Sequence, residues 1–583
     1  MREDSLFRDE QFEVRLIQGR LQFLGFVLLV CMALLALRYH YLQIEQFDRF
    51  VTLSDDNRIH VRAVPPTRGL IFDRNGVLLA ENRPSYTLSV VPENTRNIDE
   101  LVNKLAAVVS LSELDLERFH EQMEVKRRPF EPVPLRYSLS EEEVARFAVQ
   151  EFDLVGADIQ VELIRYYPLG EYFAHVVGYV GRINDRDQAA IDAEAYAGSH
   201  VIGKTGIERQ YETELLGIVG YEYVETDARG NVLRVLERHH PIPGQNVYLN
   251  IDSELQIAIH DELRGEQAAA VAIDTISSGV IALVSTPSFD PNLFVSGIST
   301  REYSALIEDP AKPLFNRALQ GQYPPGSTVK PMFGLIALQE ETITPEFTVF
   351  DPGYFILEGQ ERPYRDWKEQ GHGTVDLAKA IEESCNVFYY QLANLTGIDA
   401  LSDYGYRFGL GHPTGIDIPG EQSGVMPSPE WKSAARGIAW YPGDTVNAGI
   451  GQGFLLVTPL QMAQTTAVIA RRGLVTTPSL VYSLNELPLA IEVNDQIEID
   501  SEHWDLVSHA MRNVVHGTYG TGRAIGVGLE GYEIAGKTGT AQAISIAEDV
   551  RYDDLELEKH LRDHALFVAY APVSDPRVAV GII

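Results

Sequence analysis

Residues 320–331 read QGQYPPGSTVKP, and Ser327 and Lys330 within them form an S-x-x-K pattern. The Pro-Pro-Gly run before Ser327 is typical of a rigid turn, and the apolar run after Pro331 is typical of a helix. We therefore expect both side chains on one face of the first turn of that helix. A serine hydroxyl is a weak nucleophile until a base takes its proton, and a lysine can be that base when burial lowers its pKa. Alone, the pattern also fits an ordinary surface helix start.

A second polar pattern, Ser384-Cys385-Asn386, lies between two helix-like runs at 376–383 and 387–395. Ser384 can relay a proton between a lysine and a leaving group. Asn386 can hold a substrate amide and hydrogen-bond the lysine. This S-x-N pattern therefore adds the second group that a serine–lysine nucleophile needs.

A third pattern, the K-T-G of residues 537–539, lies in a strand-like run near the end of the chain. Lys537 can bind a carboxylate there, and Gly539 leaves room for a substrate backbone to pair against the strand. The N–H of Thr540 can form an oxyanion hole together with the N–H of Ser327. Each pattern is weak alone, but three in this order and context strongly indicate a serine acyl-transfer site.

Two further glycine-containing runs need a separate interpretation. Lys204-Thr205-Gly206 is a second K-T-G, but it precedes the nucleophile and is followed by a helix-like run rather than lying on a strand. We therefore expect Lys537 to be the functional copy. The run Gly449-Ile450-Gly451-Gln452-Gly453 lacks the preceding strand and the lysine of a phosphate loop, so it indicates tight packing near the active site.

The N-terminal part carries a membrane signal. Residues 23–37 (FLGFVLLVCMALLAL) are apolar without interruption, and their flanks extend the segment to 21–41, which is the ~20 residues that a spanning helix needs. Arg15 and Arg20 precede it, and the arginine bias favours a cytoplasmic tail at 1–20. A cleaved signal peptide is the main alternative, but no A-x-A site follows the apolar run. We expect one uncleaved anchor.

The composition of the 583 residues restricts the possible partners. Lys and Arg number 48 against 83 Asp and Glu, which gives a formal net charge of −35. This argues against nucleic acid as a partner, because phosphate binding needs a cationic surface. The only two cysteines, Cys31 and Cys385, cannot form a disulfide framework.

The chain after the anchor divides near a Pro/Gly break at 240–244. Residues 42–240 alternate apolar runs with turn signals and include a charged, helical pattern at 97–155. Residues 241–583 begin and end with strand-like runs and hold helices between them, so their sheet is assembled from distant segments. We expect a multidomain α+β chain. The last strand-like run stops at Ile583, and we expect that the sequence is a fragment lacking a C-terminal helix.

Several stretches together resemble class B penicillin-binding proteins, and within them the penicillin-binding protein 2 subfamily of rod-shape transpeptidases. The three patterns match the S-x-x-K, S-x-N and K-T-G set of penicillin-binding proteins and serine β-lactamases. The resemblance covers nearly the whole chain after the anchor. It rests on NRIHVRAVPPTRGLIFDRNGVLLAEN (57–82), YYPLGEYFAHVVGYVGRI (166–183), GKTGIERQYETELLG (203–217), QGQYPPGSTVKP (320–331), YRDWKEQGHG (364–373), GDTVNAGIGQGFLLVTPLQMA (443–463) and AGKTGTAQ (535–542).

The resemblance implies an elongated mixed α/β pedestal domain of the dimerisation type at 42–240. It implies a penicillin-binding transpeptidase domain at 241–583, with an antiparallel sheet flanked by helices. It also implies a single-pass protein of the cell inner membrane with its catalytic domain in the periplasm. A membrane glycan polymerase and elongation scaffold proteins would be its partners.

The resemblance further implies a peptidoglycan D,D-transpeptidase that crosslinks stem peptides during cell elongation. Ser327 would attack the D-Ala–D-Ala bond of a donor and release D-alanine, and an acceptor amine would take the acyl group. Lys330 would be the base, with Ser384 as relay and Asn386 as the lysine's partner. The carboxylate and the peptide strand would be bound by Lys537, Thr538, Gly539 and Thr540. β-Lactams would acylate Ser327, and no organic cofactor is needed because the donor bond carries the energy.

Four potential metal ligands lie within 35 residues of each other: Asp351, Asp366, His372 and Cys385. Two oxygens, a nitrogen and a sulfur suit tetrahedral zinc, and some members of the resembled subfamily carry zinc at the matching positions. Cys385 is the middle residue of S-x-N, so a structural zinc would brace the catalytic loop. The alternative is a buried free cysteine, a solvated aspartate pair and a loop histidine.

Two other functions fit parts of this pattern. A D,D-carboxypeptidase or β-lactamase-type hydrolase would share the fold and use water as the acyl acceptor, but it has no need of the anchor and the large N-terminal region. A non-catalytic scaffold or β-lactam sensor would use the pedestal to bind partners. The intact Ser327, Lys330 and Lys537 argue against an inactive scaffold.

Overall fold

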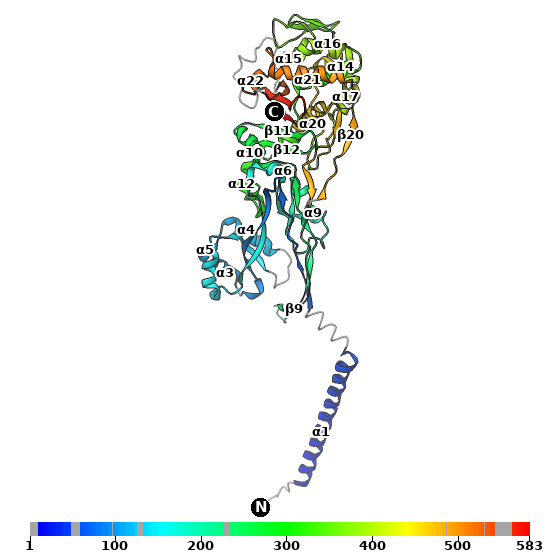
Figure 1. Cartoon of the computed structure of the whole chain (residues 1–583). Coiled ribbons are helices and arrows are strands. Elements are labelled where there is room, and N and C mark those ends of the chain that lie inside the picture. The colour runs from blue at the N-terminus through cyan, green and yellow to red at the C-terminus, as the bar shows by residue number, and fades with distance from the viewer. Residues whose placement is uncertain are drawn as a thin grey trace, which may run out of the picture.

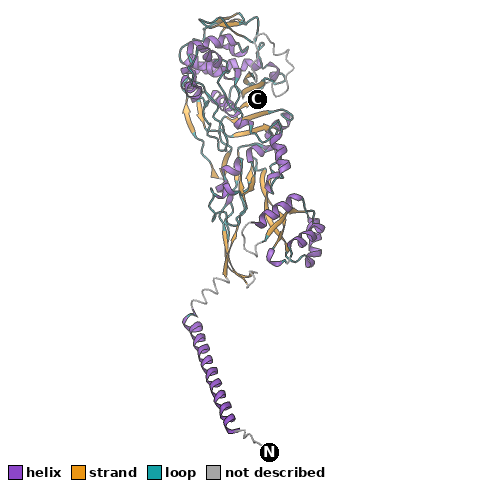
Figure 2. Ribbon diagram, turned by 180° about the vertical axis from the view of Figure 1, so that it is seen from behind, coloured by secondary structure: helices purple, strands orange, loops and turns teal. Residues whose placement is uncertain are grey.

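The computed structural model of the chain describes residues 10–47, 59–95, 97–124, 132–226, 232–485, 487–529, 531–542 and 562–583. The molecule is elongated (Figure 1), with a long helix, α1, at one end and a helix-rich globular part at the other. The part between them holds long strands with a lobe of helices at their side (Figure 2). The predicted α+β, multidomain architecture is confirmed.

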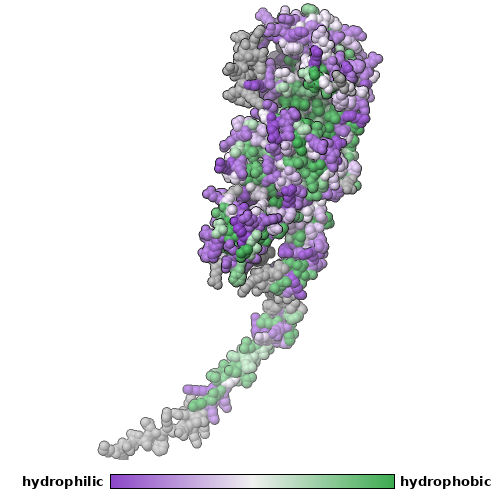
Figure 3. Space-filling model, turned by 60° about the vertical axis from the view of Figure 1, so that its left-hand side comes forward, coloured by the Kyte–Doolittle hydropathy of each residue, from purple (hydrophilic) through white to green (hydrophobic). Residues whose placement is uncertain are grey.

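The N-terminal helix α1 (Glu10–His40) carries the apolar run, and a π-helical turn (Tyr41–Glu45) extends it. Ile17–Glu45 is long and apolar enough to cross a membrane, and Figure 3 shows its hydrophobic residues uncovered by the rest of the molecule. Such a surface is costly in water and stable in a bilayer. The predicted anchor 21–41 lies within this helix, whereas residues 1–9 of the predicted tail lie outside the described residues.

Two sheets build the middle part. One is three-stranded and antiparallel in the order β1-β8-β9; the other has the order β19-β18-β10-β2-β3-β4, and β5 pairs with β3. The strands are β1 (Ile59–Val64), β2 (Ile71–Phe72), β3 (Leu78–Val90), β4 (Val133–Leu139), β5 (Ala157–Tyr166), β8 (Gly220–Thr226), β9 (Val232–His239), β10 (Val247–Leu249), β18 (Val481–Leu484) and β19 (Leu487–Pro488).

A small lobe packs three helices against one end of this larger sheet. The helices are α3 (Ile98–Val108), α4 (Glu113–Glu124) and α5 (Glu141–Gln150). Their apolar faces share a core with β3 and β4, around Leu88, Leu105 and Phe147. The helical pattern predicted at 97–155 is confirmed by these three helices, but it missed β4, which lies between α4 and α5. In β4, whose sequence is VPLRYSL, alternate residues are buried at the start of the strand. An alternation this short is hard to recognise in a sequence when charged helical segments lie on both sides of it.

The strand β10 joins the two halves of the chain. It runs parallel to β2, with Val247 opposite Ile71, and antiparallel to β18, with Val247 opposite Leu484. The Pro/Gly break at 240–244 therefore leads directly into a strand that belongs to a sheet shared by both regions. The remaining short elements of the middle part are β6 (Val180–Arg182), β7 (Val201–Gly203), α6 (Ala174–Val177), α7 (Asp185–Gln188), α8 (Gly206–Gln210) and α9 (Glu212–Leu216).

A buried ion cluster holds α8 against the strands. Glu208 is fully buried and accepts from Arg165 Nε at 2.6 Å and from Arg68 Nε at 2.7 Å. The hydroxyl of Tyr167 donates to the same carboxylate at 3.2 Å. Burial alone would raise the pKa of Glu208, but Arg165 and Arg68 hold it below its ordinary value. Arg68 also pairs with Glu212 at 2.6 Å, so two carboxylates balance the two guanidinium groups.

We expect Glu208→Ala to destabilise the protein by about 3–5 kcal/mol, because the substitution leaves buried positive charge without its partner. Denaturant unfolding of the purified full chain measures this loss. The control is Glu533→Ala, which removes an exposed partner of Arg512 and should leave the free energy of unfolding close to the wild-type value. A loss below about 1 kcal/mol in Glu208→Ala would show that the cluster does not hold the pedestal together.

The helix-rich part is built on a five-stranded antiparallel sheet in the order β12-β11-β23-β22-β21. The strand-like runs predicted at the start and at the end of this region form two strand pairs, and the predicted assembly from distant segments is confirmed because β23 of the C-terminal pair lies beside β11 of the N-terminal one. The strands are β11 (Ala268–Asp274), β12 (Val280–Thr286), β21 (Ala535–Ala541), β22 (His564–Ala571) and β23 (Val578–Ile582).

Alternate residues of this sheet enter two different cores. Ala272 and Ile281 pack against α10 (Ser253–Glu262) on one face, whereas Val271 and Ile273 belong to the main core on the other. The main core is made with α14 (Lys330–Gln339), α20 (Pro459–Ala470) and α21 (Ser501–His516). The other helices are α11 (Asn292–Val295), α12 (Thr300–Glu308), α13 (Arg317–Gln320), α15 (Leu377–Glu382), α16 (Asn386–Thr396), α17 (Ile398–Arg407), α18 (Pro429–Arg436), α19 (Pro442–Ala448) and α22 (Arg523–Gly526).

Short two-stranded ribbons complete the helix-rich part. Two of them lie between α14 and α15 in the sequence and carry the candidate metal ligands Asp351 and His372 at or beside their strands. These elements are β13 (Val349–Asp351), β14 (Tyr354–Ile356), β15 (Pro363–Arg365), β16 (Gly373–Val375), β17 (Leu474–Thr476) and β20 (Val493–Gln496).

Candidate active site

The candidate nucleophile, Ser327, lies in a 3₁₀ turn (Gly326–Val329) that runs directly into α14. Gly326 takes a positive φ of 53°, which a glycine adopts without strain. Pro331 occupies the first turn of α14, where its missing N–H removes no helical hydrogen bond. Ser327 is half-buried and Lys330 is fully buried. The predicted helix start is therefore present, with the serine one tight turn ahead of it.

The candidate base, Lys330, is held by the S-x-N segment. Its Nζ donates to Ser384 O and to Asn386 Oδ1, both at 2.8 Å, and lies 3.4 Å from Ser384 Oγ. Ser384 has a φ of 60°, a left-handed conformation that is strained for a non-glycine residue. The strained residue is thus the one whose backbone carbonyl accepts a hydrogen bond from Lys330. The two patterns, 54 residues apart in the sequence, thus meet at one ammonium group.

Burial lowers the pKa of Lys330 to about 8, and the opposing attraction of Cys385 and Asp366 is weaker. A neutral amine is the form that can accept a proton. We therefore expect the acylation rate by a β-lactam to rise about tenfold per pH unit below pH 8 and to level off above it. Stopped-flow acylation between pH 5.5 and 9.5 measures this profile, and a rate independent of pH across that range would contradict the assignment of Lys330 as the base.

The third pattern lies on β21, and Lys537 within it is fully buried. Its Nζ donates to Thr538 O at 3.1 Å, and the Thr538 hydroxyl lies 2.6 Å from the hydroxyl of Thr521. Burial, with the charge of Lys330 as the second cause, lowers the pKa of Lys537 well below its ordinary value. A carboxylate entering beside Lys537 would favour its charged form again.

The nucleophile turn packs closely on β21 because glycines line the contact. A Cβ on Gly539 would lie 2.8 Å from Thr328 Cγ2, and one on Gly326 would lie 2.5 Å from Thr540 O. Larger residues would therefore push the turn away from the strand. This contact places the turn that contains Ser327 directly against the strand that contains Thr540.

The glycine run at 449–453 packs beside the same turn, as its sequence predicts. Gly451 O accepts from Gly326 N at 2.9 Å, and a Cβ on Gly451 would meet Gly326 O at 2.0 Å. Gln452 Nε2 donates to Thr540 O at 3.0 Å. The sequence reasoning gave no role to Gln452 or to Thr521, and the position of Gln452 between two glycines was the one available signal for it.

The four candidate metal ligands converge in the interior. Their ligand atoms all lie within 4.8 Å of one another, and all four residues are buried: Asp351, Asp366, His372 and Cys385. His372 Nδ1 lies 2.7 Å from Asp351 Oδ2 and 3.5 Å from Asp366 Oδ1. Cys385 Sγ lies 3.4 Å from Asp351 Oδ2. Asp366 Oδ2 also accepts from Asn386 N at 2.6 Å, which ties the cluster to the S-x-N segment.

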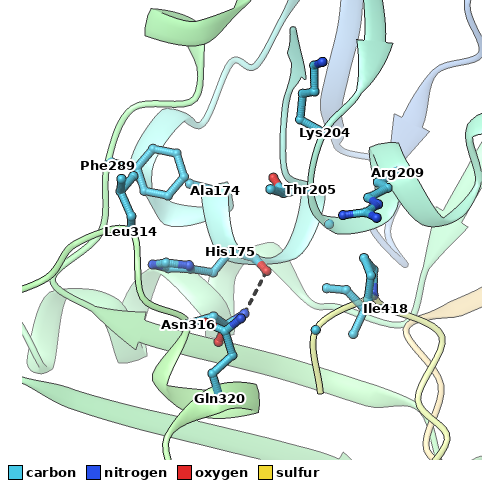
Figure 4. A pocket seen from close by; sticks show the side chains of 13 residues that line it. Ala174, His175, Lys204, Thr205, Arg209, Phe289, Leu314, Asn316, Gln320 and Ile418 are labelled. Atoms are coloured by element: carbon cyan, nitrogen blue, oxygen red, sulfur yellow. Dashed lines mark hydrogen bonds between the residues drawn. The ribbon is translucent and has the colours of Figure 1, made fainter. Parts of the chain in front are cut away.

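The second K-T-G lies away from these groups, in a pocket between the middle part and the helix-rich part. Lys204 pairs with Asp187, and Figure 4 shows its side chain pointing away from His175 and Asn316, which hydrogen-bond across the pocket. The residues after Gly206 form α8 rather than a strand. Lys204-Thr205-Gly206 therefore has a structural setting unlike that of the K-T-G on β21.

Comparison with known proteins agrees with this geometry. Residues 268–583 match the penicillin binding protein transpeptidase domain and residues 63–249 match the penicillin-binding protein dimerisation domain. The peptidoglycan D,D-transpeptidase MrdA of Acinetobacter baumannii is 42% identical over 588 residues, which cover 100% of this chain and 87% of that protein.

Three solved structures are similar to this chain over most of their length. Pseudomonas aeruginosa PBP2 in complex with WCK 5153 has 39% identity and a TM-score of 0.69, covering 90% of this chain and 92% of that one. The complex between PBP2 and MreC from Helicobacter pylori has 28% identity and a TM-score of 0.76, covering 90% and 94%. A peptidoglycan synthase complex that coordinates polymerization and crosslinking has 29% identity and a TM-score of 0.69, covering 97% and 94%. The chain belongs to the penicillin-binding protein family, within the penicillin-binding protein 2 subfamily.

Proposed function

We propose that the chain is a peptidoglycan D,D-transpeptidase that acts through an acyl-enzyme on Ser327. The observation that carries this proposal is the buried Lys330, which is held between Ser384 and Asn386 and lies one turn after the serine. As Ser327 Oγ attacks the penultimate D-alanine carbonyl, its proton moves to neutral Lys330. The oxygen that becomes negative lies between the N–H groups of Ser327 and Thr540.

Collapse of this intermediate breaks the D-Ala–D-Ala bond. The leaving amine takes a proton by way of Ser384 Oγ, which lies 3.4 Å from Lys330 Nζ. Lys537 and the hydroxyl of Thr538 bind the terminal carboxylate of the donor, and the donor backbone pairs with the edge of β21 at Thr540, in the space that Gly539 leaves open. An acceptor amine then attacks the ester by the reverse sequence. The donor bond supplies the energy, so the reaction needs no organic cofactor.

The choice of acceptor separates a transpeptidase from a hydrolase. Incubation of the full-length protein with a D-Ala–D-Ala stem-peptide donor and an acceptor amine should give mostly the aminolysis product, as shown by mass spectrometry. Ser327→Ala should give neither aminolysis nor hydrolysis. Predominant hydrolysis would favour a D,D-carboxypeptidase. Retained cell-shape function in Ser327→Ala cells would favour a scaffold.

We propose that α1 anchors the protein in the inner membrane with the rest of the chain in the periplasm. The arginines before the apolar segment favour this orientation. The family members seen with MreC and in a peptidoglycan synthase complex support an elongation scaffold and a membrane glycan polymerase as partners of this chain as well.

We also propose a structural zinc held by Asp351, Asp366, His372 and Cys385. Two buried carboxylates beside a thiol need a compensating positive charge, and oxygen, nitrogen and sulfur donors together suit zinc. His372 Nε2 is buried without a hydrogen-bond partner among the described residues, at 3.9 Å from a carboxylate oxygen of Glu383. If Nδ1 held the ion, Nε2–H would face the Glu383 carboxylate, which is the kind of partner that metal-bound histidines commonly have. The ion would brace the S-x-N segment and take no part in the reaction.

A further inference from the structure

The open edge of β21 is already occupied by side chains of the protein itself. Among the strands that the structure describes, β21 is the last of its sheet, with β22 as its neighbour. The carbonyls of Thr538 and Thr540 lie two residues apart and so point to the same side of the strand. Lys537 Nζ donates to the first at 3.1 Å, and Gln452 Nε2 donates to the second at 3.0 Å.

A donor peptide that pairs with β21 would need the second of these carbonyls. In an antiparallel pair, two opposite residues exchange both of their hydrogen bonds. A donor residue whose carbonyl accepts the N–H of Thr540 therefore aims its own N–H at the carbonyl of Thr540. The amide of Gln452 donates to the same oxygen and stands where this donor N–H would lie.

The local structure allows the Gln452 side chain to leave while its backbone stays in place. Gln452 N donates to Asn447 O at 3.1 Å, and Gly451 O accepts from Gly326 N at 2.9 Å. Gly451 and Gly453 have φ of 73° and 76°, so the loop turns sharply on both sides of Gln452. The side chain is half-buried rather than enclosed, so its carboxamide can rotate into solvent.

We propose that Gln452 is a positioning residue that acts as a placeholder for the donor peptide. In the substrate-free enzyme its amide satisfies Thr540 O and keeps the edge of β21 from pairing with unrelated strands. A ligand that brings its own N–H exchanges one hydrogen bond for another and displaces the side chain. A ligand without that N–H leaves Gln452 where it is. The proposal rests on the transpeptidase assignment and adds a determinant of ligand preference to it.

The test compares two classes of β-lactam on the full-length protein. Benzylpenicillin carries an acylamino N–H that takes the place of the donor N–H, whereas a carbapenem carries a hydroxyethyl group instead. In Gln452→Ala the acylamino ligand no longer has to displace a side chain. We expect the ratio of the second-order acylation rate constants, benzylpenicillin over carbapenem, to rise about three- to tenfold, the range of one net hydrogen bond.

Gln452→Glu keeps the size of the side chain but cannot donate, so the same rise is expected there. The matched control is Gln496→Ala, because Gln496 Nε2 also donates to a backbone carbonyl, that of Arg472, at 3.1 Å on a distant ribbon. Its ratio should stay at the wild-type value. An unchanged or lower ratio in both Gln452 variants, or loss of acylation by both ligands, would overturn the proposal. Failure of the wild-type protein to be acylated would instead overturn the transpeptidase assignment.

Discussion

Lys330→Met should lower the acylation rate by about 10³-fold, because a positioned general base contributes about 10²–10⁴-fold. Methionine fills the same buried space without an amine, so the serine loses its proton acceptor while the turn keeps its packing. The purified variant should be followed by stopped-flow fluorescence with a labelled penicillin. Its pH profile should also lose the rise below pH 8 that the lowered pKa of Lys330 predicts.

The control for this variant is Lys204→Met, which removes the lysine of the other K-T-G and its pair with Asp187. It should be acylated at the wild-type rate. Thermal unfolding shows whether Lys330→Met is folded. A folded Lys330→Met that is acylated within tenfold of wild type would show that another group, such as Lys537, removes the proton.

Removal of the proposed zinc should have the second large effect. A ligand present at a thousand times its dissociation constant stabilises the native state by about 4 kcal/mol. For an unfolding unit between the size of residues 241–583 and that of the whole chain, we expect a strong chelator to lower the Tm by about 3–6 °C. Elemental analysis of the untreated protein should find about one zinc per chain. Cys385→Ala should contain little zinc, and its Tm should no longer respond to the chelator.

The matched control is Cys31→Ala, because Cys31 is the other cysteine of the chain and lies in α1, far from the cluster. It should retain both the metal and the response to the chelator. No zinc in the wild-type protein, together with an unchanged Tm in Cys385→Ala, would leave the cluster as a buried network of hydrogen bonds.

The parts of the fold that the sequence predicts well are those with strong local signals. The apolar run of α1, the turn before Ser327 and the strand hairpins of the five-stranded sheet depend on residues close together in the chain. The contact between Lys330 and the S-x-N segment could be inferred because three spaced patterns form a known set. These features need no knowledge of how the two halves of the chain pack.

The features that were missed depend on contacts between distant segments. β10 has three residues, and only its pairing with β2 and β18 shows that one sheet joins the two regions. The bond between Gln452 and Thr540 spans 88 residues and involves one side chain without a motif of its own. The left-handed conformation of Ser384 likewise has no sequence signal, because serine rarely adopts it.

The most direct test is to locate the acyl group. Full-length protein should be incubated with benzylpenicillin, digested and analysed by tandem mass spectrometry. A penicilloyl group on the peptide that contains Ser327, with full occupancy and none in Ser327→Ala, is the result that a serine acyl-enzyme predicts. An adduct on any other residue, or an unmodified Ser327 after prolonged incubation of folded protein, would contradict it.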